Sequence, residues 1–273
     1  MDEAARTGLA LLLLAAVAGV VPLVDGVRQT RAVAWSATRG AVQLLTVGLL
    51  LGAVFRAPLA VLPVLAVMVV AATATVTPRL AELPALGSWR RPAAVAAAVT
   101  SGAAVTGTVV FATGALPLAV RNLVAVGGIT LGGAMTASTL AGRRFLAELR
   151  SRRPEVEGKL ALGATMRQAT ADLVGVAVAE ALVPALDQTR TTGLVTLPGA
   201  FVGALFGGAS PLAAARFQLV VLVGLLAAES VAAVVLLRLL AAVPFLPLTA
   251  AAEPRPGPAA TWARRLAPPR RPR

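Results

Sequence analysis

The chain has 273 residues, of which 58% are hydrophobic and 14% charged, and its formal net charge is +13. It contains no cysteine and no histidine, which excludes disulfides, His/Cys metal centres and every Cys–His or Ser–His nucleophile. Such an excess of apolar residues, in runs of membrane-crossing length, is typical of an all-α, polytopic integral membrane protein in a lipid bilayer, with no nucleic acid as a partner.

Seven apolar runs approach the length of about 20 residues that a membrane-spanning helix needs. A further segment, 166–184, is apolar enough to be an eighth span, but Asp172 and Glu180 interrupt it. We expect this segment to form an amphipathic or partly inserted helix on the cytoplasmic side. The seven predicted spans are residues 7–24, 37–55, 59–76, 92–115, 118–141, 192–209 and 212–240.

Arginine placement predicts the orientation of these spans. Basic residues gather after the first, third, fifth and seventh runs, above all between Arg143 and Arg167. Since basic loops face the cytoplasm, the pattern predicts an external N-terminus and a cytoplasmic C-terminus in the plasma or inner membrane. We expect residues 1–250 to form the membrane domain, and the Pro/Arg-rich residues 251–273 to form a disordered basic tail.

The loop after residue 150 carries the clearest local signals. Pro154 can start a short helix, and Gly163 can end it. The run Thr165-Met166-Arg167-Gln168 fits a capping box, in which Thr165 caps the next helix and Gln168 reaches back to the Thr165 amide. The loop is therefore predicted to form two short helices with a tight break. A rigid protrusion of this kind suits insertion into a groove on a partner, but an ordinary connection between spans has the same signals.

Five segments occur in an order that is matched in a known family. They are RGAVQLLTVGLLLGAVF (39–55), GGAMTASTLAGRR (132–144), EGKLALGATMRQA (157–169), ALVPALDQTRTTGLVTLPGAFVGALFGGASP (181–211) and ARFQLVV (215–221). Together they resemble the iron-export ABC transporter permease family, which includes plant permeases linked to aluminium tolerance. The string EGKLALGAT is also similar to the coupling segment of ABC importers. One departure is Gly133, which stands where the bacterial iron exporter of this family has asparagine.

The resemblance implies the permease subunit of an ABC exporter, with a metal ion, iron in the family, as substrate. Two copies of the permease would dock on separate cytoplasmic ABC ATPase subunits. ATP and Mg would be bound by those partners, and no cofactor by this chain. The chain has no phosphate-binding loop of its own, so we do not expect it to be an enzyme. The implied coupling residues are Glu157, Leu160, Leu162, Gly163, Ala164 and Thr165.

Polar residues inside or beside apolar runs are candidates for a translocation path or for local structural pairs. Arg39 and Gln43 are one helical turn apart, although Arg39 can also snorkel to the interface. Asp187 and Arg190 are three residues apart and can pair with each other. Glu229 is the only acidic residue deep in a predicted span, where it is either a path residue or a buried structural carboxyl. The thioether of Met135 is a further candidate ligand, and the metal ligands remain unassigned.

A stripe of small residues, Gly199, Gly203 and Gly207, lets helices approach closely in lipid. It serves either packing within the chain or contact between two permeases. Two rival hypotheses stand beside the exporter. One is a proton-coupled secondary transporter that uses Asp187 and Glu229 as carriers. The other is a membrane scaffold without transport, whose basic tail binds anionic lipids.

Overall fold

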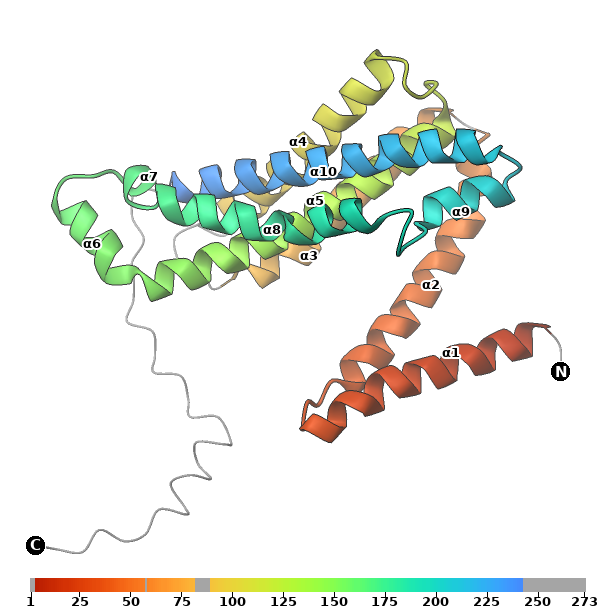
Figure 1. The fold of residues 1–273 in the computed structure, drawn as a ribbon, viewed down its shortest axis with the longest axis horizontal. Coiled ribbons are helices and arrows are strands. Elements are labelled where there is room, and N and C mark those ends of the chain that lie inside the picture. Colours follow the sequence, from red (N-terminus) through yellow and green to blue (C-terminus); the bar gives the residue numbers. More distant parts are fainter. Residues whose placement is uncertain (1–2, 57, 82–88, 243–273) are drawn as a thin grey trace, which may run out of the picture. The chain divides into compact units, whose positions relative to one another are not determined.

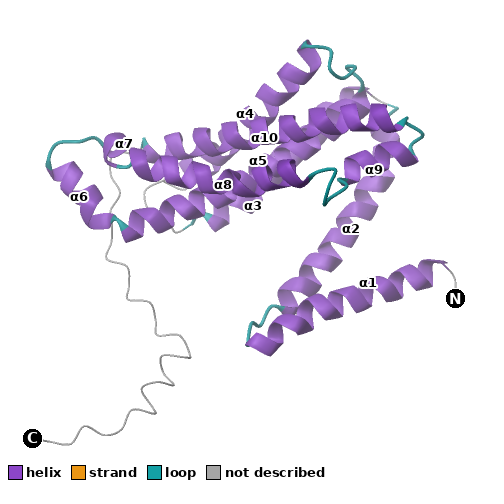
Figure 2. Ribbon diagram, in the orientation of Figure 1, coloured by secondary structure: helices purple, strands orange, loops and turns teal. Residues whose placement is uncertain are grey.

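The computed structural model describes residues 3–56, 58–81 and 89–242, and this part of the chain is built from helices (Figures 1 and 2). The all-α fold class is therefore confirmed. The predicted tail over 251–273, and its boundary with the membrane domain at 250, lie outside the described residues. The chain divides into two units, residues 1–64 and 65–273, each of which is described by itself.

The first unit is a pair of helices joined by a short turn. The helices are α1 (Glu3–Val20) and α2 (Thr30–Val54), and a 3₁₀ turn, Val21–Asp25, follows α1. The Thr30 hydroxyl donates a hydrogen bond to the Gly19 carbonyl oxygen at 2.9 Å, which ties the start of α2 to the end of α1. Most of the large apolar side chains of both helices are exposed, as expected for helices that meet lipid.

The second unit is a bundle in which α10 runs along α4, α5 and α8 (Figure 1). The fully buried side chains of its core include Phe145, Leu173, Leu236 and Leu237. Because α6 and α7 connect α5 to α8, they lie at one end of the bundle, whereas α9 lies at the opposite end. After α3 (Val61–Arg79), which begins at the boundary between the units, the helices are α4 (Arg90–Ala112), α5 (Val120–Ser151), α6 (Arg153–Ala161), α7 (Met166–Ala169), α8 (Ala171–Thr191), α9 (Gly199–Phe206) and α10 (Pro211–Ala241).

Small residues bring α4 and α10 into close contact. A Cβ atom added at Gly102 would overlap the Ala228 carbonyl oxygen and lie 3.3 Å from the Ala232 Cβ. Near this contact, the Thr106 hydroxyl donates a hydrogen bond to the Gly224 carbonyl oxygen at 3.1 Å. Glycine at 102 therefore sets the separation of the two helices, as small residues commonly do in membrane bundles.

Within the described residues, five helices are long and apolar enough to cross a membrane, namely α1, α3, α4, α5 and α10. The helices α2 and α8 also reach membrane-spanning length, at 25 and 21 residues. The protein is a polytopic, multi-pass membrane protein. The number of seven spans stays a prediction, which α2 and α8 would complete.

The prediction of a span over residues 192–209 is wrong. Residues 192–198 form a turn that includes Gly193 with φ 88°, and Pro198 precedes α9 in an extended conformation. With eight residues, α9 is too short to cross a hydrocarbon core of about 30 Å. The long helix in this part of the chain is α8, which precedes the predicted span.

The segment 166–184 forms α7 and most of α8, and its place on the cytoplasmic side of the membrane stays a prediction. The helix α8 is part of the bundle. It packs against α5 and α10 and buries Leu173, Ala177 and Ala181 in the core. The acidic residue that argues against a span, Glu180, is paired with Arg144 of α5 at 2.8 Å. A partner on another helix thus accommodates a charge that the local sequence leaves unexplained.

Candidate functional site

Two features of the second unit are candidates for function, and the first is the connection from α5 to α8. We call α6, the turn after it and α7 (residues 153–169) the elbow. Pro154 lies in the first turn of α6, as predicted. At its end, the Gly163 amide donates to the Leu160 carbonyl at 3.0 Å and the Ala164 amide to the Lys159 carbonyl at 3.0 Å, which is the Schellman pattern. Gly163 has φ 89°, a conformation that glycine adopts without strain.

The capping box at the start of α7 is confirmed. The Gln168 amide donates to the Thr165 hydroxyl oxygen at 3.3 Å, and the Thr165 amide donates to the Gln168 side-chain oxygen at 2.8 Å. The Thr165 and Gln168 amides, which have no partner within the helix, are thus satisfied by one pair of residues. Since the end of α6 and the start of α7 are both capped, the intervening turn has a defined geometry.

The elbow presents an apolar side chain to the outside. Leu162 is 90% exposed, while Leu160 and Ala164 on either side of it are partly buried and pack against the core of the bundle. Glu157 is exposed and pairs with Arg153 at 2.7 Å. The predicted coupling residues therefore divide into anchors that hold the elbow and an exposed tip at Leu162.

Ion pairs tie the elbow to the start of α8. Lys159 Nζ lies 2.7 Å from Asp172 Oδ2 and 2.9 Å from Glu155 Oε1, and Arg152 also contacts both carboxylates. The hydrogen bond from Lys159, followed by that from Arg152, lowers the pKa of Glu155, and the hydrogen bond to Asp172 raises the pKa of Lys159. These groups are solvent-exposed, so each pair stabilises little by itself. Together they fix the direction of α6 relative to α8. This network is not among the features predicted from the sequence, although Glu155 and Lys159 have the spacing of a helical ion pair.

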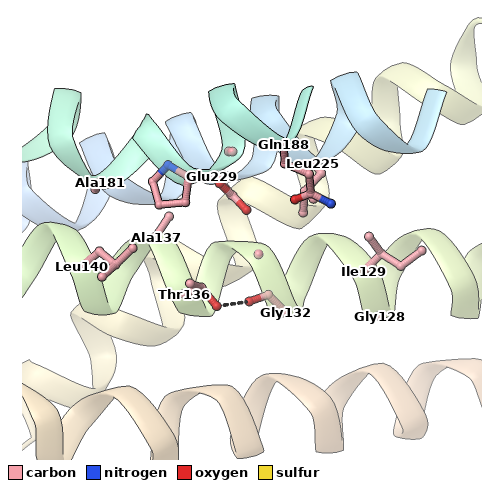
Figure 3. Close-up of a pocket in the computed structure, with 13 residues that line it drawn as sticks. Gly128, Ile129, Gly132, Thr136, Ala137, Leu140, Ala181, Gln188, Leu225 and Glu229 are labelled. Atoms are coloured by element: carbon pink, nitrogen blue, oxygen red, sulfur yellow. Dashed lines mark hydrogen bonds between the residues drawn. The ribbon is translucent and has the colours of Figure 1, made fainter. Parts of the chain in front are cut away.

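The second feature is a cavity of about 340 Å³ between α5, α8 and α10 (Figure 3). Large apolar walls come from Ile129, Leu140 and Leu225, and small residues of α5 and α8 supply most of the remainder. The polar side chains that line it are Thr136 of α5, Gln188 of α8 and Glu229 of α10. Sequence reasoning found Glu229 but not Thr136 or Gln188, which carry no distinguishing local signal.

Glu229 is 9% exposed, and its side chain extends from α10 toward α5 in Figure 3. A Cβ added at Gly133 would overlap Leu225 Cδ1 and lie 2.7 Å from Glu229 Oε1 and 3.2 Å from its Cγ, so glycine at 133 leaves room for both side chains. Among the described residues, none forms a hydrogen bond or ion pair with it. Twelve residues separate Glu229 from Ala241, the last residue of α10, which is roughly 18 Å along the helix.

The other predicted path residues do not line this cavity. Asp187 and Arg190 are exposed near the end of α8 and form a local ion pair at 3.5 Å. Met135 is partly buried and packs against the core. Arg39 and Gln43 lie on α2 of the first unit and are exposed there. In the part of the chain that the structure describes, no group of three or more Asp, Glu, His or Cys side chains is placed to hold a metal ion.

The predicted glycine stripe lies on α9. A Cβ added at Gly199 or Gly203 would meet nothing within 4 Å, and one at Gly207 would meet only carbonyl oxygens of its own helix. Among the described residues of the second unit, the stripe therefore packs against no neighbouring helix. Its use in contact between two permeases stays a prediction.

Comparisons with known proteins place the chain among membrane proteins. Residues 6–245 match the family described as Uncharacterised protein family (UPF0014). The UPF0014 membrane protein YjkA of Bacillus subtilis (strain 168) is 31% identical over 198 residues, which are 72% of this chain and 78% of that protein. The probable iron export permease protein FetB of Escherichia coli (strain K12) is 29% identical over 231 residues, covering 82% and 85%.

A plant relative matches a shorter segment. The UPF0014 membrane protein STAR2 of Oryza sativa subsp. japonica is 38% identical over 139 residues, which are 51% of this chain and 49% of that protein. The chain thus spans about half the length of the rice protein. No solved structure matches it.

Proposed function

Since this chain belongs to the UPF0014 family of membrane proteins, we propose that it is the permease subunit of an ABC exporter driven by a separate ATPase. The family includes a probable iron export permease, and iron is the substrate that this likeness favours. Two copies of the permease, each docked on an ATPase subunit that binds ATP and Mg, form the transporter. The chain supplies the path and the docking surface but no nucleotide site.

The observation that carries this proposal is the exposed tip of the elbow. Leu162 is 90% exposed beside a turn fixed by caps on both sides. Exposing a large apolar side chain on a rigid, otherwise charged protrusion favours insertion into a groove on a partner protein. A flexible connection would instead lose conformational entropy whenever it bound such a groove.

The link from elbow to cavity supports the coupling of ATP hydrolysis to transport. Asp172, in the first turn of α8, pairs with Lys159 of the elbow, and Gln188, near the end of the same helix, lines the cavity. One continuous helix of 21 residues, with Pro184 inside it, therefore connects the two features. When the ATPases close, displacement of the elbow moves α8 against α5 and α10, and the cavity between them opens to the other side.

The orientation predicted from the arginines is retained when α8 replaces residues 192–209 as the sixth span. One crossing substitutes for another, so the N-terminus stays outside and the C-terminus stays in the cytoplasm. The elbow then lies in the cytoplasm of a cell whose plasma or inner membrane holds the protein. Its position matches the place where a cytoplasmic ATPase docks.

The test is copurification of the chain with its candidate ATPase, followed by measurement of ATPase activity. Leu162→Glu should abolish docking, because a carboxylate that enters an apolar groove loses its hydration and gains no partner there. Leu194→Glu is the matched control, since Leu194 is 91% exposed but lies at the opposite end of α8. Docking of the Leu162→Glu variant at the level of the control would refute the coupling role of the elbow.

The rival hypothesis, a proton-coupled secondary transporter, is tested in proteoliposomes that contain this chain alone. If a proton gradient drives metal uptake or release in these vesicles without ATP or ATPase, the exporter proposal is wrong and the secondary transporter is supported. Under the exporter proposal, metal movement in the same vesicles requires both the partner subunit and ATP.

A further inference from the structure

We infer that Glu229 is the anchor of a cation-binding site in the cavity between α5, α8 and α10. The inference rests on the proposed transport function and specifies its substrate class. The ligand is a divalent metal cation that keeps part of its water shell. Glu229 neutralises its charge, and the oxygens of Thr136 and Gln188 contact the ion or its waters.

The first support is the contrast between Glu229 and the other carboxylates of the second unit. Each other acidic residue that the structure describes from α5 onward has a basic partner within 3.5 Å. Glu229 alone in this set is enclosed and unpaired. An unpaired carboxylate in an apolar bundle is costly, and acidic residues at membrane depth commonly mark ion paths. A bound cation removes this cost while the carboxylate stays ionised, whereas in a purely structural role the carboxyl has to be neutral.

The second support is that the bundle makes space for the carboxylate without giving it a donor. The path of the Glu229 side chain crosses α5 at Gly133, where any Cβ would crowd both Oε1 and Cγ. The Thr136 hydroxyl donates to the Gly132 carbonyl oxygen at 3.1 Å (Figure 3), so its lone pairs are left to accept or to coordinate. The polar groups that line the cavity with Glu229 can thus serve as oxygen ligands, which hard divalent cations prefer.

The size of the cavity favours a cation that retains water. At about 30 Å³ per water molecule, a cavity of about 340 Å³ has room for roughly eleven waters. This exceeds the volume of one metal ion with six waters. One carboxylate, one amide and one hydroxyl cannot replace a full octahedral shell, so the ion keeps several of its own waters. Ile129, Leu140 and Leu225 form apolar walls that offer the ion no ligand, so Glu229 is the one charged group of the described chain that lines the cavity.

The experiment measures Mn²⁺ binding to the purified full-length chain in lipid nanodiscs, using the electron paramagnetic resonance signal of free Mn²⁺. Glu229→Gln keeps the size of the side chain and removes its charge, and we expect it to weaken Mn²⁺ binding by about tenfold or more. Asp187→Asn is the matched control, because Asp187 is an exposed carboxylate that already has a partner. We expect this variant to bind Mn²⁺ as the unaltered chain does.

A second variant, Gly133→Ala, tests geometry at constant charge. The added methyl group would crowd both Leu225 and the Glu229 carboxylate, so we expect weaker Mn²⁺ binding although the charge remains. Thermal unfolding of each variant separates loss of binding from loss of fold. Because Glu229→Gln removes an uncompensated buried charge, its unfolding temperature should not fall.

Unchanged Mn²⁺ binding in Glu229→Gln overturns the inference, as does equal loss in Asp187→Asn, which would indicate non-specific attraction to negative charge. If the chain binds tetraethylammonium through Glu229 but does not bind Mn²⁺, the assignment to metal cations is overturned. The docking experiment on Leu162 is independent of these results. Docking that depends on Leu162 without Mn²⁺ binding that depends on Glu229 rejects this inference alone, whereas absence of docking rejects the proposed function.

Discussion

Around the elbow, acidic and basic side chains pair with one another at the surface, whereas in the cavity the carboxylate of Glu229 is enclosed and unpaired among the described residues. The elbow gains its rigidity from local caps and exposed pairs, and it offers an apolar tip. The cavity gains its shape from packing in the bundle, and it offers a charge. Each feature thus holds a side chain that its surroundings disfavour: Leu162 is apolar and exposed, and Glu229 is a carboxylate buried in an apolar bundle. A binding partner would remove the unfavourable exposure of the first and the unpaired charge of the second.

The contrast predicts that packing changes inside the bundle cost more than changes at the elbow. Gly102→Val should be the most damaging single substitution, because its side chain would overlap the Ala228 carbonyl and force α4 from α10. We expect a loss of about 1–3 kcal/mol in the free energy of unfolding, measured by denaturation in a defined detergent.

The control for this variant is Gly107→Val on the same helix. A Cβ added at Gly107 meets nothing within 4 Å, so only the intrinsic preferences of the helix change. Equal destabilisation by the two substitutions would show that the α4–α10 contact does not set the stability of the bundle.

At the elbow, Gly163→Val should have a smaller effect on the fold and a large one on docking. A β-branched residue at φ 89° costs about 1–2 kcal/mol, and the cost can be relieved by unwinding the local turn. We therefore expect the bundle to remain folded while ATPase copurification and stimulated ATP hydrolysis are lost. Gly158→Ala, within α6 and with open space around it, should retain both activities. Retention of docking by Gly163→Val would mean that the elbow need not be rigid.

The same contrast explains how far the sequence determines the structure. The starts and ends of the two elbow helices are predictable from the sequence, because their signals are local. Pro154 starts α6, Gly163 ends it, and Thr165 with Gln168 caps α7. Each of these signals acts within four residues and does not depend on the rest of the fold.

The place of α8 in the bundle is not predictable from the sequence, because its determinants are tertiary. Residues 192–209 have the hydropathy of a span, but Gly193 and Pro198 interrupt the helix. In α8, Glu180 has a partner in Arg144 on another helix, which no local pattern reveals. Glu229 was visible because an isolated carboxylate in an apolar run stands out. The residues that line the cavity with it depend on which faces of α5 and α8 turn inward.

The smallest expected effect concerns pH and the pairs that tie the elbow to α8. Hydrogen bonds from Lys159, and next from Arg152, hold the pKa of Glu155 below its ordinary value of 4.5. A carboxyl whose pKa is lower in the folded state stabilises that state fully above its unfolded value, and this contribution is lost as pH falls through the lowered pKa. The amides of α6 should therefore exchange hydrogen faster at acid pH, after correction for intrinsic exchange, while those of α10 do not. Glu155→Gln removes the titrating group, so α6 should exchange faster already at neutral pH and show little further acid dependence. If α6 in this variant keeps the acid response of the unaltered chain, a group other than Glu155 controls the acid-dependent exchange of its amides.

If neither protein responds to acid, the ion pairs add nothing to the local rigidity that the caps at Gly163 and Thr165 already supply.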